Sequence, residues 1–408
     1  MSPEMSNKLF ILASSEGIGG AESRTIKYAH YAAKTYERDV VLLINQSLYD
    51  RVRDNQLLNG LIKEKNLTLK IYESSQNKYL SEAVRNILLK TPLFKKLLPF
   101  VPKFFIKQLS WFPTLKKEVK EGDSLHCIFG DTARVGTYFF SKSKYGYKIP
   151  CIVEITSNRH VETWGCHLNY CFSKKELPGN LFVKCVSDTV YHNLKPNVRA
   201  YILKYISAYP GPFIIIPKEK AVQKENIILF AHRFIPPKNP LLFAQAIVEM
   251  YNENKLHGWK IHIRGNGSLE PEIRKELNGL LKSNIVEIGY STDLINESKK
   301  SKIFVSIIET GNYPSQSLFE CMRYGSILVL SNRGVTKEKI GNNEAIHYVE
   351  DLSVGEIKNS LLKAITQADS NSFEQLSKSI EGRYEDIASN SGYLETVNGI
   401  YQNVRRKN

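Results

Sequence analysis

Residues Ser306 to Ser331 read SIIETGNYPSQSLFECMRYGSILVLS, and this stretch decides the fold class. The run Ile303 to Ile308 is almost continuously apolar, which is typical of a parallel-sheet strand covered on both faces. A glycine and a proline interrupt the chain next, and apolar residues then recur at helical spacing until Gly325. A second strand is predicted over Ser326 to Leu330. Strand, loop, helix and strand together form a βαβ unit.

The loop of this unit, Glu309 to Ser317, is the expected place for a ligand. In open α/β sheets, ligands bind outside the carboxyl ends of the strands, beside helix N-termini whose N–H groups attract anions. Two glutamates, Glu309 and Glu320, lie on either side of the break. Their spacing raises the question of what each would hold.

Length and composition limit the possible classes of protein. The chain has 408 residues, 42% of them apolar, so a soluble protein of two domains is expected. Its apolar runs are all too short to span a bilayer, and six cysteines without a Cys-x-x-Cys pair favour reduced thiols. These features predict a cytoplasmic protein. A net charge of +15 favours an anionic partner, of which nucleic acid, anionic lipid and phosphate-rich substrates are three kinds.

Two series of strand patterns divide the chain. The first is predicted at Lys8–Ala13, Val40–Ile44, Leu67–Tyr72, Ser124–Phe129, Cys151–Ile155 and Phe182–Ser187. The second is predicted at Ile227–Phe230, Lys260–Ile263, Val286–Ile288 and Ile303–Ile308. The sequence therefore predicts an α/β domain over 1–208, a proline-containing linker over 209–224, a second α/β domain over 225–385, and a C-terminal helix over 386–408 that can cross back to the first domain.

The second series carries a particular order of motifs. NIILFAHRF is followed by IPPKNP, then IRGNG ends the next strand, and the opening stretch comes later. This order resembles the donor domain of glycosyltransferase family 4, whose usual text is Gly-Arg-Leu, Lys-Gly, Gly-x-Gly, and two glutamates separated by seven residues. The resemblance implies a GT-B fold, with two Rossmann-like domains facing a central cleft, and retaining transfer from a nucleotide sugar.

The resemblance also implies roles for single residues. Arg233 and Lys238 would grip the diphosphate of the donor, because guanidinium and ammonium groups form charge-assisted bonds to phosphate. Glu320 would hold the ribose hydroxyls. The remaining donor-binding candidates are Gly265 and Gly267, which would let the backbone approach the nucleotide, and Ser315, Gln316 and Ser317 at the helix start. Each assignment has a structural alternative. Arg233 and Lys238 can be solvated residues of a surface loop, Glu320 can be an ordinary exposed helix residue, and the glycines can serve only to form a turn.

The first motif glutamate is missing. The residue eight positions before Glu320 is Asn312, and Tyr313-Pro314-Ser315 replaces the common Gly-Phe-Gly. Asn312 can still hydrogen-bond a sugar hydroxyl, because an amide both donates and accepts. Glu309 is the other candidate for this position, and the choice between the two stays open. We expect both among the catalytic residues, with Arg233 and Lys238.

The first half is expected to bind the acceptor. Gly19, Gly20 and Glu22 lie in a glycine-rich loop that resembles the family's first loop, although a tight strand-to-helix turn explains the glycines equally well. Glu22 can also complement a helix dipole. His126 and Glu154 end or lie within predicted strands and are further cleft candidates. Structural roles in the core are the alternative for both.

One segment falls outside the donor argument. Leu88 to Lys120 holds eight lysines, one glutamate and four prolines among many Phe and Leu residues. Short basic amphipathic pieces can lie in a membrane interface, with lysines on anionic headgroups. Core helices with a solvated lysine face are the alternative. The segment is predicted to bind an anionic membrane surface, which would place the protein on the inner face of the cell membrane.

The combined prediction is a metal-independent hexosyl- or related glycosyltransferase of cell-surface polysaccharide biosynthesis. It would move a sugar from a nucleotide-sugar donor to a hydroxyl of a glycan, expected to be lipid-linked. No cofactor, no metal and no nucleic-acid partner are expected. A nucleotide-sugar 2-epimerase of the same fold and a non-enzymatic glycan- or nucleotide-binding protein are the alternatives.

Overall fold

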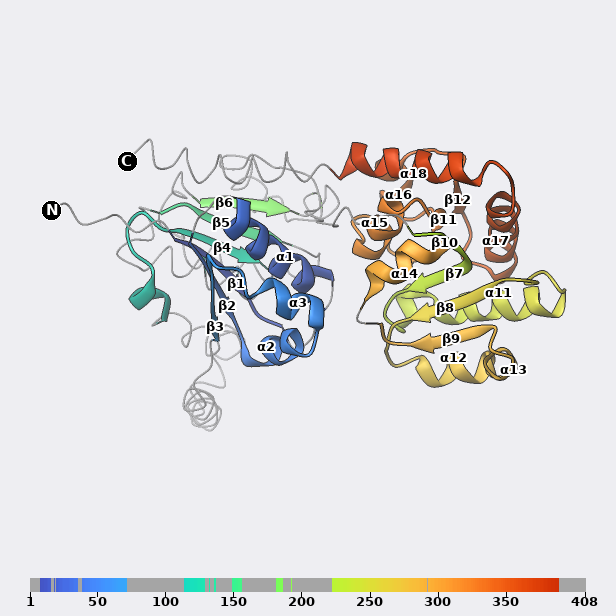
Figure 1. Ribbon diagram of the computed structural model, residues 1–408, viewed down its shortest axis with the longest axis horizontal. Helices are drawn as coiled ribbons and strands as arrows, with labels where there is room; N and C mark the ends of the chain where they lie inside the picture. The colour runs from blue at the N-terminus through green and yellow to red at the C-terminus, as the bar shows by residue number, and fades with distance from the viewer. Residues whose placement is uncertain are drawn as a thin grey trace, which may run out of the picture. The chain divides into compact units, whose positions relative to one another are not determined.

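The computed structural model describes residues 8–15, 18, 20–35, 39–71, 114–128, 132, 136, 149–155, 181–185, 192, 222–291 and 293–388. These residues fall into two compact units, the first containing the described residues up to 192 and the second those from 222 to 388. Figure 1 shows a parallel sheet with flanking helices in each unit. The predicted domain boundaries, at 208/209, 224/225 and 385/386, stay predictions; the first of them lies outside the described residues.

The first unit is built on a six-stranded parallel sheet in the order β3-β2-β1-β4-β5-β6. Its strands are β1 (Leu9–Ala13), β2 (Val40–Ile44), β3 (Leu67–Ile71), β4 (Ser124–Ile128), β5 (Cys151–Ile155) and β6 (Leu181–Cys185). Its helices are α1 (Gly20–Thr35), α2 (Gln46–Arg53) and α3 (Gln56–Leu61). Strands β1 and β2 are buried along their whole length, as their unbroken apolar runs predict.

The second unit repeats this arrangement with the order β12-β11-β10-β7-β8-β9. Its strands are β7 (Glu225–Ala231), β8 (Lys260–Arg264), β9 (Val286–Gly289), β10 (Ser301–Ser306), β11 (Ile327–Ser331) and β12 (Ile346–Val349). Its helical elements are the 3-10 turn η2 (Pro236–Lys238), α11 (Pro240–Asn252), α12 (Glu270–Glu276), α13 (Asn278–Lys282), α14 (Leu294–Lys300), α15 (Gln316–Arg323), α16 (Thr336–Ile340), α17 (Val354–Ala368) and α18 (Phe373–Ile387).

Helices cover both faces of the second sheet. Helix α11 packs against α17 and α12, whereas α15 packs against α14 and α18 (Figure 1). The core between them is apolar and includes the fully buried rings of Phe230, Phe243, Phe304 and Phe319. In each unit the strand order reverses beside the first strand, which is the topological switch point of a doubly wound sheet.

The predicted strands are confirmed where they can be compared, with ends that differ by a few residues. The strand predicted at Ile303–Ile308 runs from Ser301 to Ser306, and β12 was not predicted. Pro314 lies just before the N-cap of α15, Ser315, and not inside the helix. Among the described residues, no helix is both long enough and apolar enough to cross a membrane.

Candidate functional site

Two loops of the second unit meet at its switch point. The Lys238 loop, residues 232–239, follows β7, and the Glu309 loop, residues 307–315, follows β10. The amide nitrogen of Glu309 donates to the carbonyl of Pro237 at 2.9 Å, and Nδ2 of Asn239 donates to the carbonyl of Ile307 at 2.9 Å. Because β7 and β10 are hydrogen-bonded neighbours, both loops leave the same edge of the sheet. The two bonds fix Glu309 beside the turn that carries Lys238.

Lys238 and Arg233 make this loop electropositive. Arg233 is exposed and Lys238 is half-buried at the end of η2. Burial, and to a smaller extent the neighbouring charge of Arg233, lower the pKa of Lys238 to about 8. A cation that is held partly out of water beside another cation is stabilised by an anionic ligand. The loop is therefore suited to bind phosphate.

His232 lies in the same loop and was not singled out by the sequence. Its ring centroid lies 5.1 Å from that of Phe230 and 5.8 Å from that of Phe304. Burial, with a contribution from Lys238, lowers the pKa of His232 to about 3, so the imidazole is neutral at physiological pH. Within the described part of the chain, its buried Nε2 has no hydrogen-bond partner. His232 stands where the family text has glycine, and that departure was the available signal.

Gly265 and Gly267 pack against the backbone of the Lys238 loop. A Cβ at Gly265 would overlap the carbonyl oxygen of His232, and a Cβ at Gly267 would overlap that of Phe234. The amide of Phe234 donates to the carbonyl of Asn266 at 2.8 Å. These glycines therefore permit a close approach of the Lys238 loop, and their predicted closeness to a nucleotide stays a prediction.

Asn312 is buried and links the Glu309 loop to the neighbouring strands. Only 1% of its surface is exposed. Its Oδ1 accepts from the hydroxyl of Ser306, and its Nδ2 donates to the carbonyl and hydroxyl oxygens of Ser331 at 3.2 and 3.0 Å. Its backbone amide donates to Oγ1 of Thr336 at 2.7 Å. The side chain is therefore committed to holding the loop on β10 and β11, whereas Glu309 is exposed.

Helix α15 begins beside the Glu309 loop and carries the remaining donor candidates. Ser315 is the N-cap, and its hydroxyl lies 3.3 Å from that of Ser317. Nε2 of Gln316 donates to Oε1 of Glu320 at 2.7 Å, one helical turn later. Glu320 is 2% exposed. The first turn thus offers backbone N–H groups to an anion, with a carboxylate behind them.

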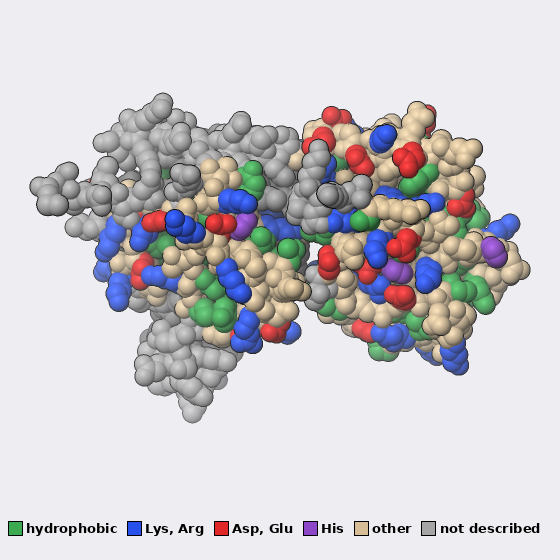
Figure 2. Space-filling view, in the orientation of Figure 1, with side chains coloured by type: hydrophobic (Ala, Val, Ile, Leu, Met, Phe, Trp, Pro, Cys, Tyr) green, Lys and Arg blue, Asp and Glu red, His purple; other side chains and the backbone are tan. Residues whose placement is uncertain are grey.

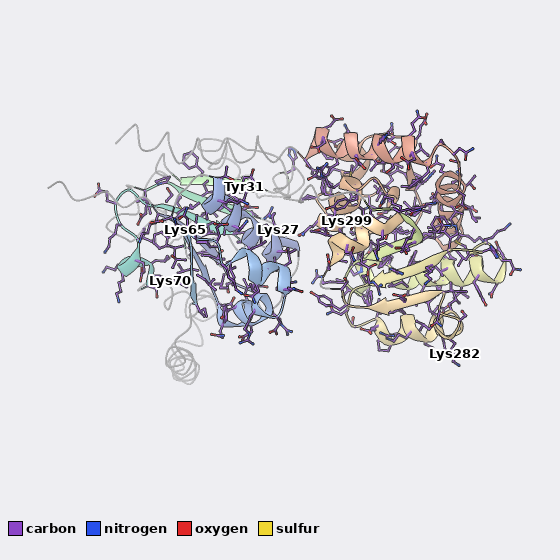
Figure 3. The ribbon with its side chains drawn as sticks, in the orientation of Figure 1. Lys27, Tyr31, Lys65, Lys70, Lys282 and Lys299 are labelled. Carbon is purple, nitrogen blue, oxygen red and sulfur yellow. The ribbon has the colours of Figure 1, made fainter. Side chains whose placement is uncertain are left out.

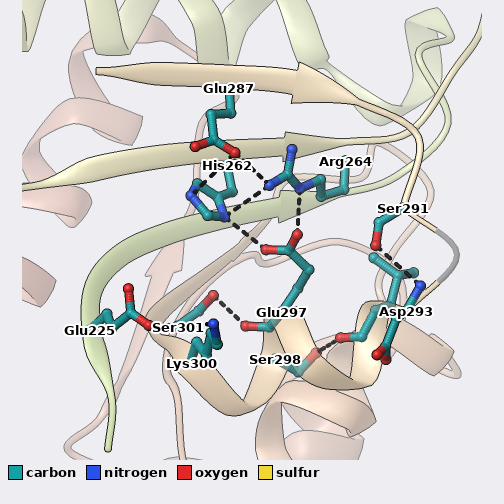
Figure 4. A network of polar contacts seen from close by, with 11 residues as sticks. Glu225, His262, Arg264, Glu287, Ser291, Asp293, Glu297, Ser298, Lys300 and Ser301 are labelled. Atoms are coloured by element: carbon teal, nitrogen blue, oxygen red, sulfur yellow. Dashed lines mark hydrogen bonds and ion pairs between the residues drawn. The ribbon is translucent and has the colours of Figure 1, made fainter. Parts of the chain in front are cut away.

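A charged network adjoins the glycines. Arg264, the last residue of β8, donates through Nε to Glu297 at 2.7 Å and through Nη2 to Glu287 at 2.9 Å (Figure 4). Nδ1 of His262 lies 2.7 Å from Glu297, whose pKa is lowered, against the effect of burial, by hydrogen bonding to His262 and by the Arg264 charge. The network fixes the end of β8 immediately before Gly265. Sequence patterns gave no sign of it, because its members come from three elements.

In the first unit, His126 and Glu154 are buried together. They are 0% and 1% exposed, and Nε2 of His126 lies 3.4 Å from Oε2 of Glu154. Glu154 also pairs with Arg24 of α1, and the ring of Tyr28 lies 5.1 Å from that of His126. The pair links α1 to β4 and β5. This burial favours the structural alternative for both residues, and their predicted place in a cleft stays a prediction.

The glycine-rich loop is described in part. Helix α1 begins at Gly20, with Glu22 in its first turn, and Gly19 lies outside the described residues. The amide nitrogen of Ser15 donates to Oδ1 of Asn45, and Nδ2 of Asn45 donates to the carbonyl of Ser15, both at 3.0 Å. This two-bond clamp fixes the chain where it leaves β1. It joins the start of the loop to the end of β2.

Basic residues are spread over the described surface. Figure 2 shows Lys and Arg side chains interspersed with Asp and Glu on the visible face. The labelled lysines of Figure 3 come from several elements, among them Lys70 on β3, Lys282 on α13 and Lys299 on α14. Lys70 is paired with Glu118 at 2.5 Å. The segment Leu88 to Lys120 lies mostly outside the described residues, and so does its predicted membrane contact.

Among the residues described, no group of three or more His, Cys, Asp or Glu side chains is arranged to hold a metal ion. Burial raises the pKa of two thiols, Cys127 and Cys321, the latter to about 12. The polar groups gathered at the switch point include cations, amides, hydroxyls and carboxylates.

Comparison with known proteins agrees with this geometry. Residues 213–381 match the family model of glycosyl transferases group 1. The matched range contains the Lys238 loop, the Glu309 loop and α15.

One curated relative is an α-1,4-N-acetyl-D-galactosaminyltransferase of Campylobacter jejuni that acts on GalNAc-α-(1→4)-GalNAc-α-(1→3)-diNAcBac-PP-undecaprenol. It is 26% identical over 234 residues. The match covers 55% of this chain and 60% of the relative, so it spans less than two thirds of that enzyme's length. The relative is a distant one.

Solved structures extend the likeness to the whole chain. A glycosyltransferase from Rickettsia africae superposes with a TM-score of 0.64 at 15% identity, covering 99% of this chain and 100% of its own. HepE from Anabaena, solved with UDP and glucose, has a TM-score of 0.63 at 12% identity, covering 97% and 100%. With two doubly wound parallel sheets, the chain has the GT-B fold.

Proposed function

We propose that this protein is a retaining, metal-independent glycosyltransferase that moves a sugar from a UDP-sugar to a hydroxyl of a lipid-linked glycan. The observation that carries the proposal is the junction of the Lys238 loop with the Glu309 loop at the switch point, through the Glu309–Pro237 hydrogen bond of 2.9 Å. It brings two cations, an exposed carboxylate and a helix start to one edge of one sheet. This combination suits a ligand with a diphosphate at its centre and hydroxyl groups at both ends.

The diphosphate lies against Arg233 and Lys238 in this proposal. Both cations neutralise the negative charge that develops on the leaving diphosphate as the bond to the sugar breaks. The first N–H groups of α15 add fixed partial charges that need no reorganisation during the reaction. These groups supply the charge stabilisation that a metal ion supplies in other transferases.

In this proposal the carboxylates of Glu320 and Glu309 bind opposite ends of the donor. Glu320 accepts hydrogen bonds from the ribose. Glu309, exposed and tied to the Lys238 loop, accepts from hydroxyls of the transferred sugar, and Asn312 holds the loop that presents it. This division assigns the first motif position to Glu309 and a positioning role to Asn312, because the amide of Asn312 is already engaged by Ser306 and Ser331.

Retention follows from a same-face reaction. The acceptor hydroxyl approaches the anomeric carbon on the side that the diphosphate leaves, and a phosphate oxygen removes the acceptor proton. The new glycosidic bond then has the configuration of the donor. No protein nucleophile is required, and the residues named above orient the donor and stabilise its leaving group.

UDP is proposed as the nucleotide because the HepE structure holds UDP, and a lipid-linked glycan is proposed because the Campylobacter relative acts on an undecaprenol-linked one. Such acceptors lie at a membrane surface. Peripheral binding to the inner face through Leu88 to Lys120 accords with the net charge of +15. Cosedimentation with vesicles of anionic lipid tests this part, and charge reversal at Lys95, Lys96, Lys103 and Lys107 should release the protein.

The test of the proposed function is transfer itself. Purified protein is incubated with UDP-GalNAc, UDP-GlcNAc or UDP-glucose and a short-chain prenyl-diphosphate saccharide, and the product is identified by mass spectrometry and its anomeric configuration by NMR. A lengthened saccharide with the donor's configuration is expected, and Lys238→Ala should lose most of the rate. Conversion of the UDP-sugar to an epimer without acceptor would contradict the proposal.

A further inference from the structure

Gln316 and Glu320 form one unit on the inner face of α15. They are four residues apart, so their side chains lie one above the other along the helix. Nε2 of Gln316 donates to Oε1 of Glu320 at 2.7 Å. A carboxylate only accepts hydrogen bonds, so this contact fixes which end of the amide faces it. Oε1 of Gln316 must therefore point away from Glu320.

That oxygen is an acceptor without a donor. It is buried, and among the described residues it has no hydrogen-bond partner. Buried polar atoms are nearly always paired in native proteins, because an unpaired one loses its hydration without compensation. Gln316 itself is the first residue of α15, which follows Ser315 and the Glu309 loop. Because this acceptor lies beside the proposed donor site, we expect it to accept a hydrogen bond from a hydroxyl of the bound ligand.

The hydrogen bond between Gln316 and Glu320 indicates which chemical group of a ligand would fit here. Oε1 of Gln316 and the carboxylate of Glu320 are two acceptors on neighbouring side chains, held in register by their own hydrogen bond. A ribose carries two vicinal hydroxyls, each of which donates one hydrogen bond. A deoxyribose lacks one of them. Two acceptors on adjacent side chains suit the complete diol, and either deoxy form lacks one of the two donors.

We propose that Gln316 is a specificity-determining residue of the nucleotide site, whose Oε1 accepts from one ribose hydroxyl while Glu320 accepts from the other. The inference rests on the proposed function, because it takes the bound nucleotide to be the UDP part of the donor. It adds to that function the ability to select ribonucleotides over 2′- or 3′-deoxyribonucleotides. The selection resides in a side-chain oxygen that Glu320 orients.

The test is calorimetric binding of UDP, 2′-deoxy-UDP and 3′-deoxy-UDP to the full chain. Wild type should bind UDP more tightly than both analogues. Gln316→Met keeps the length of the side chain and removes the acceptor, so its affinity for UDP should fall about 5- to 10-fold, which is the usual effect of one lost hydrogen bond. Its affinity for one of the two deoxy forms should stay at the wild-type value, because that form lacks the hydroxyl in question. The preference for UDP over that analogue should disappear.

Two control variants separate this effect from others. Gln245→Met changes a half-buried glutamine of α11 in the same way and should leave all three affinities unchanged. Lys238→Ala should weaken all three nucleotides by the same factor, because it removes a contact to phosphate. Melting temperatures of the variants check that each is folded.

The outcomes are distinct. If Gln316→Met keeps the wild-type preference over both deoxy forms, the inference is wrong and the proposed function stands. If wild type binds UDP but does not distinguish it from either analogue, the inference is again wrong. If wild type binds no UDP at millimolar concentration, the proposed function fails, and the inference fails with it.

Discussion

The amide nitrogen of Glu309 lies 2.9 Å from the carbonyl oxygen of Pro237 and donates a hydrogen bond to it. The bond joins the loop after β10 to the turn that ends in Lys238, although the two residues are 72 positions apart in the sequence. The bond couples the positions of the two loops. A ligand that draws Lys238 inward should also draw Glu309 inward.

Replacing Arg233 or Lys238 with alanine should lower kcat/KM by about 10- to 150-fold, because each loses charge-assisted bonds worth roughly 1.5–3 kcal/mol. The measurement is steady-state transfer from the UDP-sugar, with unfolding followed in parallel. Lys282→Ala, a lysine of α13 away from the switch point, is the control. Wild-type kinetics in both site variants would remove these residues from the mechanism.

The affinity for UDP should fall as the pH rises through the pKa of Lys238. That pKa is lowered to about 8, so the ammonium is charged below this pH and loses its charge above it. If only the charged form binds, the dissociation constant should rise about tenfold between pH 7 and pH 9. Calorimetry across this range checks the slope. Lys238→Arg keeps its charge throughout and should show a flat profile, since an arginine does not titrate there.

Asn312→Ala should destabilise the second unit. It removes the buried hydrogen bonds of Asn312 to Ser306 and Ser331, so the free energy of unfolding should fall by about 2–3 kcal/mol. Asn332→Ala, which removes only an exposed bond to Glu350, should change it by less than about 0.5 kcal/mol. Chemical denaturation measures both. A stable Asn312→Ala protein would show that the loop does not depend on this amide.

Whereas Asn312→Ala should lower stability, Glu309→Gln should lower activity and leave stability almost unchanged. Its side chain is exposed, so stability should change little, whereas kcat should fall about tenfold or more because contacts to the transferred sugar strengthen in the transition state. Binding of UDP without a sugar should be unaffected. Loss of UDP affinity in this variant would place Glu309 at the nucleotide and not at the sugar.

His232 should make the protein acid-sensitive. Its pKa in the folded chain is lowered to about 3 from 6.5, so between these values the unfolded chain binds the proton that the folded chain excludes. The stability due to neutral His232 is complete above pH 6.5 and is lost as the pH falls toward 3. At pH 5 the loss should be about 1–2 kcal/mol. His232→Phe keeps the aromatic packing and should show a smaller loss over the same range in urea titrations.

The sequence predicted most of this architecture because parallel strands buried on both faces leave unbroken apolar runs, as in Leu9–Ala13 and Val40–Ile44. The motif order also placed Arg233, Lys238 and Glu320 in one unit. It left Glu309 and Asn312 as alternatives, because an amide in a loop has the same appearance whether it faces a ligand or a neighbouring strand. The proposal favours Glu309 because Asn312 bonds to Ser306 and Ser331, which come from other elements.

The glycines show a second limit of sequence reasoning. Gly265 and Gly267 were expected to let the backbone approach a nucleotide, which stays a prediction, and in the structure they make room for the carbonyls of His232 and Phe234. A glycine reports that space is short, but it does not say what fills the space. The Arg264 network is invisible for a similar reason, since His262, Glu287 and Glu297 are ordinary surface residues by type.

The placement of the candidate groups within the second unit has a consequence for engineering. Every residue assigned to the donor, from Arg233 to Glu320, belongs to the same sheet and its loops, and the first unit has its own sheet with the same strand order. If the proposed function holds, donor choice and acceptor choice are encoded in separable segments of the gene. A chimera that joins this second unit to the first unit of a related enzyme should keep the donor preference of one parent and inherit the acceptor of the other.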